Sequence, residues 1–203
     1  MNDRHNHRED RLGISPGGLH RLLHSIWFPV VHRALARELA PRIGETVLDV
    51  GCGTGELARR LARSGAHVVG VDPDERSVAV ARAWGKPSTI EYHLAAAERL
   101  PLQDGSVDAV VSSVSAHHWE DREKGFAELA RVLRPGGRIV FAELRPAGSV
   151  RRALDRRHAH RDLPSASEWR RLMASAGFEN ARVVAVGWRR YFALFIRAEQ
   201  RPS

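Results

Sequence analysis

An apolar run from Val47 to Val50 that passes directly into three alternating glycines, Gly51, Gly53 and Gly55, constrains this chain more than any other feature. The run has the length and composition of a buried strand. Because glycine lacks a Cβ, such a turn admits positive φ and lets backbone N–H groups approach a ligand closely. Apolar residues then recur at helical spacing, at Leu57, Ala58, Leu61 and Ala62. The order strand, glycine turn, helix is typical of the first unit of a doubly wound nucleotide fold; the alternative is an ordinary glycine loop.

The glycine spacing argues against a dinucleotide. The dinucleotide fingerprint Gly-x-Gly-x-x-Gly places a third glycine where this chain has Glu56. A carboxylate at a helix N-terminus suits the helix dipole, but it would repel a diphosphate lying there. We therefore expect a ligand that is uncharged or cationic at this point.

A second apolar run, Val68–Val71, ends in Asp72 and is stopped by Pro73. An acidic side chain at the end of this strand can accept hydrogen bonds from both hydroxyls of a ribose. The alternative is that Asp72 only caps the next helix. Its distance from the glycine turn favours ribose recognition.

Five blocks of sequence occur in an order that is typical of one enzyme family. They are Val47–Gly55, Val69–Asp72, Ala97–Leu102, Val107–Ser113 and Leu129–Arg138. In these blocks the chain resembles the class I S-adenosylmethionine-dependent methyltransferases, in the methyltransferase type 11 group that is typified by quinone-biosynthesis C-methyltransferases. The resemblance runs from about Val47 to Leu144 and more loosely to the end of the chain.

The resemblance implies S-adenosylmethionine as cofactor and S-adenosylhomocysteine as product. It implies that Asp49 and the glycine turn hold the methionine end, that Asp72 holds the ribose, and that the loop Ala96–Glu98 lies beside the adenine. The family usually has an acidic residue where this chain has Ala96, and the loss of that neutral hydrogen bond would weaken binding by about 1 kcal/mol. Glu98 or a backbone carbonyl is the expected substitute. The other residues expected near the cofactor are Cys52, Pro73, Ala97, Ser113 and Val114.

Hydrophobic periodicity predicts an α/β fold with a doubly wound, mostly parallel sheet. Helices are expected over 74–84 and about 123–133, and strands over 90–94, 107–112 and 138–143. Ser165–Glu168 has capping-box spacing for a last helix that Gly177 closes, and 181–186 with 191–196 reads as a terminal antiparallel hairpin. The resemblance implies a seven-stranded, Rossmann-like methyltransferase fold.

The expected organisation is a disordered segment over 1–11 and one methyltransferase domain over 12–203. Within it, 12–42 form a helical cap, 43–145 the cofactor-binding core and 146–203 the C-terminal helix and hairpin. Pro29 predicts a kink or a break between two helices in the cap. The resemblance implies that the cap closes over the cofactor; the alternative is a helix packed on the sheet.

Composition limits the partners. The chain has 203 residues and a formal net charge of +8, with no run of apolar residues long enough to span a membrane and no apolar segment behind its charged N-terminus. We expect a cytoplasmic protein without a membrane partner. Its arginines are scattered through every predicted helix, so a nucleic acid is a less favoured partner than a small molecule. The single cysteine, Cys52, needs no role beyond its small size in the turn.

The strand that ends at Ser112 delivers His117 and His118 to the edge of the sheet where reacting groups lie. Imidazole titrates near neutral pH, so both are candidate bases; the alternative is that one packs against Trp119 and the other is solvated. We expect no metal, because His158 and His160 lack a nearby ligand set. The candidate acceptor contacts are Trp27, His32, Arg33 and His158.

The favoured function is S-adenosylmethionine-dependent methyl transfer to the oxygen, nitrogen or carbon of a small-molecule acceptor. An RNA methyltransferase and a cofactor-binding protein without methyl transfer are the alternatives. The sequence carries no indication of the acceptor's identity or of oligomeric state.

Overall fold

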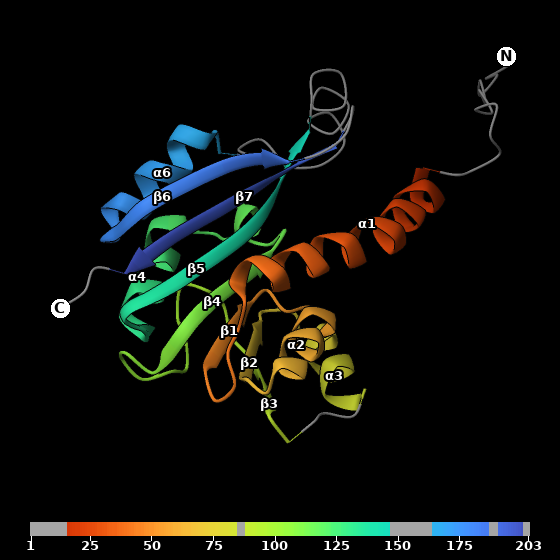
Figure 1. Ribbon diagram of the computed structural model, residues 1–203. Helices are drawn as coiled ribbons and strands as arrows, with labels where there is room; N and C mark the ends of the chain where they lie inside the picture. Colours follow the sequence, from red (N-terminus) through yellow and green to blue (C-terminus); the bar gives the residue numbers. More distant parts are fainter. Residues whose placement is uncertain (1–15, 85–87, 147–163, 187–190, 201–203) are drawn as a thin grey trace, which may run out of the picture.

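Residues 16–84, 88–146, 164–186 and 191–200 are described by the computed structural model (Figure 1). They contain a seven-stranded sheet in the order β3-β2-β1-β4-β5-β7-β6. The strands are β1 (Thr46–Val50), β2 (His67–Asp72), β3 (Ile90–Leu94), β4 (Val107–Ser113), β5 (Leu133–Pro146), β6 (Phe178–Val186) and β7 (Tyr191–Gln200). The helices are α1 (Pro16–Leu39), α2 (Glu56–Leu61), α3 (Glu75–Ala83), α4 (Arg122–Val132) and α6 (Ala166–Ser175), with 3₁₀ turns η1 (Ala62–Ser64) and η2 (Ala116–His118).

The sheet confirms the predicted topology. Strands β1 to β5 pair in parallel, while β7 is antiparallel to both β5 and β6. Strand β1 has β2 on one side, with Leu48 opposite Val69, and β4 on the other, with Leu48 opposite Val110. The strand order therefore reverses between β1 and β4, and ligands of doubly wound folds bind at the carboxyl edge of such a switch point.

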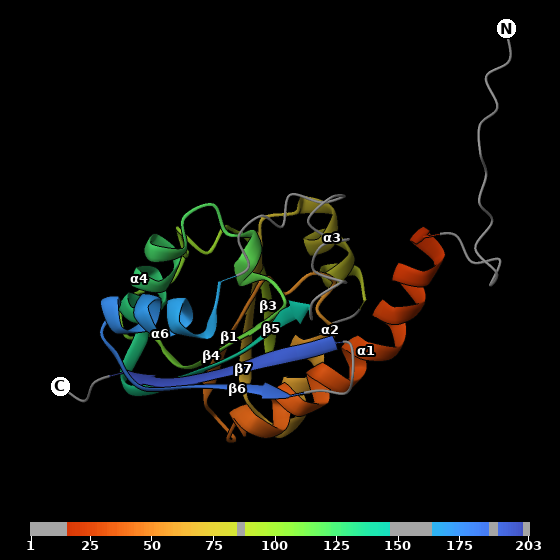
Figure 2. The same cartoon turned by 90° about the horizontal axis from the view of Figure 1, so that it is seen from above.

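Helices cover both faces of the sheet with separate apolar cores. On one face, Phe126 of α4 packs in a cluster with Trp169 and Met173 of α6. On the other face, Leu35 of α1 and Leu57 of α2 belong to a second cluster. Figure 2 shows α4 and α6 together at one side of the molecule and α1 with α2 at the other. A sheet buried on both faces explains why its central strands read as continuous apolar runs.

Helix α1 runs through Pro29 as one element, so the predicted break between two helices does not occur. Its C-terminal part packs on the sheet through Val31, Leu35 and Leu39, which are buried. Arg138 of β5 fastens that end, because its Nε donates to the Leu39 carbonyl at 2.9 Å. The N-terminal part of the helix extends beyond the sheet (Figure 1). Packing on the sheet is therefore correct for the C-terminal part of the predicted cap.

The remaining predicted elements lie close to their expected positions. Helix α3 has Asp74 as its N-cap, and the capping box of α6 forms, with the Ser165 N–H donating to Glu168 at 2.6 Å. Strand β5 begins at Leu133 rather than Arg138, since Leu133 pairs with Val107 before a register shift. The predicted disordered segment 1–11 lies outside the described residues. None of the helices in the described part of the chain is long and apolar enough to cross a membrane.

Candidate functional site

The glycine turn after β1 adopts the conformation that its sequence predicts. Gly51, Gly53 and Gly55 have φ angles of +71°, +52° and +77°, which residues with a Cβ rarely adopt. The backbone N–H groups of Gly51 and Cys52 donate to the Val71 carbonyl at 2.8 and 3.0 Å. The turn is thereby fastened to the end of β2, and its open side lies at the carboxyl edge of the sheet.

Asp72 joins the end of β2 to the glycine turn. Its Oδ2 accepts a hydrogen bond from the Gly53 N–H at 2.8 Å, and its Oδ1 accepts one from the Asp74 N–H at 2.9 Å. The N-cap of α3 is Asp74, whose carboxylate accepts from the Ser77 N–H at 3.0 Å. Capping is therefore not the role of Asp72. Each of its oxygens keeps a lone pair that can accept a hydrogen bond from a ligand hydroxyl.

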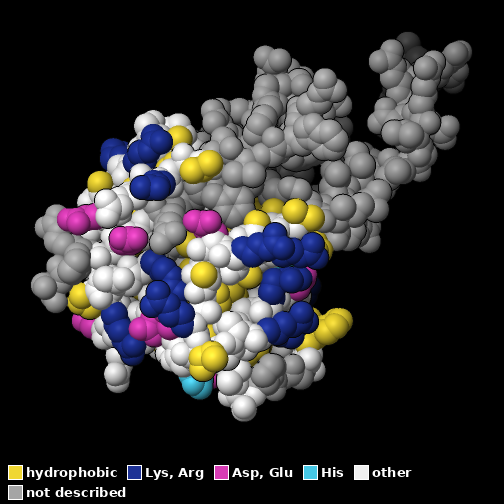
Figure 3. All heavy atoms as spheres, in the orientation of Figure 1, with side chains coloured by type: hydrophobic (Ala, Val, Ile, Leu, Met, Phe, Trp, Pro, Cys, Tyr) yellow, Lys and Arg dark blue, Asp and Glu magenta, His cyan; other side chains and the backbone are white. Residues whose placement is uncertain are grey.

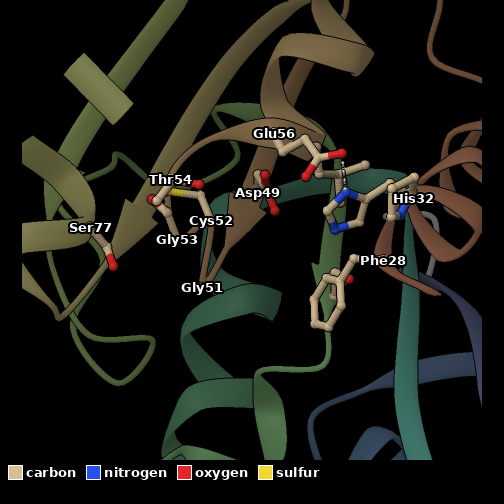
Figure 4. A pocket seen from close by; sticks show the side chains of 12 residues that line it. Phe28, His32, Asp49, Gly51, Cys52, Gly53, Thr54, Glu56 and Ser77 are labelled. Atoms are coloured by element: carbon tan, nitrogen blue, oxygen red, sulfur yellow. Dashed lines mark hydrogen bonds and ion pairs between the residues drawn. The ribbon is translucent and has the colours of Figure 1, made fainter. Parts of the chain in front are cut away.

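A cavity of about 370 Å³ opens beside the turn (Figure 4). Helix α1 contributes His32 to its wall, and α2 contributes Glu56. Figure 4 shows these two side chains facing each other, with His32 Nδ1 at 3.7 Å from Glu56 Oε1. The other lining residues are Phe28, Pro29, Asp49, Gly51, Cys52, Gly53, Thr54, Leu57, Ser77 and Ser113. Three segments far apart in the sequence, α1, the turn and the end of β4, therefore share one cavity.

Asp49 is the buried charge of this cavity. The residue is 1% exposed, and neither of its carboxylate oxygens makes a hydrogen bond within the described part of the chain. Burial raises the pKa of the Asp49 carboxyl to about 7; the Asp72 carboxylate adds to the rise, and the Ala58 backbone N–H opposes it. A buried carboxyl without a partner is costly in its ionised form. Such a group is suited to receive a hydrogen-bond donor or a cation from a ligand.

The raised pKa of Asp49 predicts a pH-dependent stability. A folded-state pKa above the unfolded value makes the folded protein lose stability as the pH rises from about 4 to about 7, with no further loss from this group above that range. Asp49→Asn removes the ionisation. We expect the variant to be more stable than the wild type at pH 8, by up to about 4 kcal/mol at 1.36 kcal/mol per pKa unit, and the difference to vanish toward pH 4. Urea unfolding across this pH range measures it; parallel profiles for both proteins would contradict it.

Cys52 lines the same cavity but is not built as a nucleophile. Its side chain is buried, and burial together with the Asp49 and Asp72 carboxylates raises the pKa of the thiol far above the ordinary value. Since the thiolate is the reactive form, this environment keeps the sulfur inert.

A second cavity, of about 240 Å³, shares Gly51 as a lining residue with the first. Residues after β2 and β3 form one wall, and residues of the η2 segment form the other. Its lining residues are Val50, Gly51, Pro73, Ala95, Ala96, Ala97, Glu98, Ser115, His118, Trp119 and Glu120. Ala96 is exposed here and offers no side-chain acceptor, while Glu98 Oε1 accepts from the Asp121 N–H at 3.1 Å. Gly51 lines both cavities, so one elongated ligand could occupy both.

The two histidines of η2 have different surroundings. The His117 side chain is 3% exposed, and its Nδ1 lies 2.8 Å from Oε2 of Glu143, a buried residue of β5. His118 is exposed and lines the second cavity, and the two rings lie with their centroids 3.9 Å apart. Sequence reasoning did not single out Glu143. The available signal was a carboxylate inside the apolar run Ile139–Leu144.

The structure brings together most of the predicted cofactor residues. Asp72 and Gly55 line neither cavity, but each lies within the turn's hydrogen-bonded frame: Asp72 accepts from Gly53, and Gly55 donates to the Cys52 carbonyl at 2.9 Å. Val114 also lines neither cavity. It has a φ of +56°, which is rare for a β-branched residue, and strain of this kind is frequent at functional sites.

The predicted acceptor contacts are only partly placed. His32 lines the first cavity, whereas Arg33 is exposed on α1 and does not line either cavity. The Trp27 side chain and the whole of His158 lie outside the described residues.

Comparison with known proteins identifies the segment that carries this geometry. Residues 48–141 match the model of a family described as "Methyltransferase domain". This segment is therefore similar to that family. The match covers the glycine turn, Asp72, η2 and most of β5, but not α1, which also lines the first cavity.

Two curated relatives are similar to part of this chain. An uncharacterized methyltransferase of Mycobacterium tuberculosis is 48% identical over 101 residues, which are 50% of this chain and 40% of that protein. A demethylmenaquinone methyltransferase of Clavibacter sepedonicus is 42% identical over 125 residues, or 60% and 51% of the two chains. The chain thus spans only about half, or less, of the length of these curated relatives.

A solved structure shows the same fold. Phosphoethanolamine N-methyltransferase 2 of Haemonchus contortus, in complex with phosphomonomethylethanolamine and S-adenosylhomocysteine, has a TM-score of 0.73 at 19% identity. The similarity covers 92% of this chain and 54% of that one. It extends the likeness of fold beyond residues 48–141.

Proposed function

We propose that the chain transfers a methyl group from S-adenosylmethionine to a small-molecule acceptor. The observation that carries the proposal is the buried Asp49 carboxylate, which has no hydrogen-bond partner among the described residues and lies in a cavity that the glycine turn and Glu56 also line. S-adenosylmethionine carries an ammonium and a sulfonium, so a wall with two carboxylates suits its methionine end. A diphosphate would be repelled there.

Different residues of the chain would bind different parts of the cofactor. Asp49 and the glycine turn would hold the methionine end in the first cavity, and Asp72 would hold the ribose between the cavities. The second cavity, with Pro73 and the Ala96–Glu98 loop, would hold the adenine. Bound there, the cofactor supplies an electrophilic methyl group. The work of the protein is to align an acceptor with that group and, for a hydroxyl or an acidic carbon, to remove a proton.

We infer a compact, partly aromatic acceptor rather than RNA. Lys and Arg side chains on the face drawn in Figure 3 are spread over several elements with Asp and Glu among them, rather than gathered in one groove. The relative named as a demethylmenaquinone methyltransferase supports the same choice. RNA binding, by contrast, would appear as an affinity that falls steeply with salt in a filter-binding series, and such a result would overturn the small-molecule assignment.

Calorimetry with S-adenosylmethionine and S-adenosylhomocysteine tests the cofactor assignment. We expect saturable binding of both, with an increase in Tm at saturating ligand. Absence of heat and of thermal stabilisation would overturn every cofactor-dependent function. A screen of metabolite pools with isotopically labelled methyl donor then tests transfer. Binding of the cofactor without any labelled product would favour a cofactor-binding protein that transfers no methyl group. The absence of an acidic side chain at Ala96 is the observation that favours this alternative.

A further inference from the structure

Glu143 is a buried carboxylate to which the proposed function gives no task. It lies in the C-terminal half of β5, is fully buried, and both of its oxygens are engaged. Oε1 accepts from the Ala116 backbone N–H at 2.8 Å, and Oε2 lies 2.8 Å from His117 Nδ1. Both partners belong to η2. One side chain of β5 thus holds the backbone and the ring of the 3₁₀ turn that follows β4.

The protonation of His117 follows from this contact. An ionised carboxylate is an acceptor only, so a short contact with Nδ1 requires a proton on that nitrogen. In the neutral ring the other nitrogen, Nε2, is then unprotonated. We propose that Glu143 is a positioning residue that fixes His117 in this Nδ1–H tautomer and so makes Nε2 the proton-accepting nitrogen. The proposal rests on the function proposed above only for the use of that nitrogen.

The charge of Glu143 has a second consequence. With a neutral His117, the buried pair carries one uncompensated negative charge; with a proton on Nε2 it becomes an ion pair of zero net charge. A low-dielectric site stabilises the second state relative to an isolated imidazolium, as the carboxylate of a catalytic triad does. The His118 side chain is exposed and lines the second cavity, whereas the His117 ring is buried against Glu143. The geometry therefore favours His117 as the base.

The turn itself is held from two further points. Arg122 of α4 donates to the Ala116 carbonyl at 3.3 Å and to the His117 carbonyl at 3.1 Å. Trp119 Nε1 donates to Ser115 Oγ at 3.3 Å. Since this backbone is held independently of Glu143, a substitution at Glu143 can change the ring's proton without dismantling the turn.

Nitrogen-15 NMR of the histidine rings tests the proposal without any acceptor or cofactor. In the wild type at pH 8 we expect His117 with a protonated Nδ1 and an unprotonated Nε2, the signal being assigned by its loss in His117→Asn. In Glu143→Gln the amide oxygen can still accept from Ala116, but the amide N–H₂ donates to Nδ1. The proton should therefore move to Nε2, and the two nitrogen signals should exchange their character.

The ranking of two variants separates this role from a merely structural one. Glu143→Asp keeps the charge but fits the space less well, whereas Glu143→Gln keeps the shape but loses the charge. We expect His117 to keep the Nδ1–H tautomer in Glu143→Asp and to lose it in Glu143→Gln. This ranking should hold even if Glu143→Gln has the higher Tm of the two variants. Glu45→Gln is the matched control, because Glu45 pairs with Arg138 at 2.8 Å, away from η2; it should leave the His117 signals unchanged.

Three results would overturn the proposal: an Nε2–H tautomer in the wild type, a ring protonated on both nitrogens at pH 8, or an Nδ1–H tautomer that persists in Glu143→Gln. None of them depends on methyl transfer. A failure of the cofactor assignment would instead appear in the calorimetry and leave these spectra unchanged.

Discussion

Replacing His117 lowers kcat by about 100-fold or more while the Kd for S-adenosylmethionine changes little. A positioned general base contributes about 10²–10⁴-fold to such a step, and His117 lines neither of the two cavities assigned to the cofactor. His117→Ala leaves Glu143 buried without its ring partner, a loss that itself destabilises the fold. His117→Asn is therefore the second variant, because its amide N–H can still donate to Glu143. Single-turnover rates with the acceptor from the labelled-methyl screen, beside calorimetry, measure both quantities.

His118→Ala serves as the matched comparison. The same sequence argument made both histidines candidates, but His117 is buried against the Glu143 carboxylate, whereas His118 is exposed. We expect the larger loss of kcat from His117. A larger loss of kcat in His118→Ala would identify His118, which lines the second cavity, as the base. Full turnover in both single variants would show that neither histidine is the base.

Asp72→Ala weakens S-adenosylmethionine binding by about 100-fold or more. Two ribose hydroxyls would lose a charged acceptor, and hydrogen bonds to charged groups contribute about 1.5–3 kcal/mol each, so their sum corresponds to a factor of roughly 10² or above. The Gly53 N–H also loses its partner, which loosens the turn. Calorimetric titration of the cofactor measures the change in Kd.

Asp108→Asn controls for a general loss of stability. Asp108 also accepts a backbone N–H, from Thr46 at 2.8 Å, and pairs with Arg134 at 2.6 Å, but both contacts lie at the amino ends of β1 and β4. It should lower the free energy of unfolding and leave the Kd for the cofactor unchanged. An unaltered Kd in Asp72→Ala would remove Asp72 from the ribose site.

Local patterns were sufficient for most of the fold. The apolar run and three glycines after Val47 encode a buried strand and a turn with positive φ, since glycine adopts that backbone without the steric cost of a Cβ. Asp74 and the Ser165–Glu168 box place the starts of α3 and α6, because capping depends only on residues three positions apart. Pro29 predicted a kink or a break between two helices, and the break does not occur: packing of Val31, Leu35 and Leu39 on the sheet favours a continuous helix over the local cost of proline.

The glycine turn and the acidic end of β2 follow from the sequence alone, because each depends on residues adjacent in the chain or on a recurring spacing. Only the tertiary structure decided which carboxylates act on which groups. It places Glu143 of β5 against His117, 26 positions earlier, and Glu56 of α2 opposite His32 of α1. Such pairs arise where strands and helices distant in sequence converge at the carboxyl edge of the sheet, and no local periodicity encodes them. Burial is likewise a property of the packed molecule, and burial is what leaves the Asp49 carboxyl with a pKa of about 7.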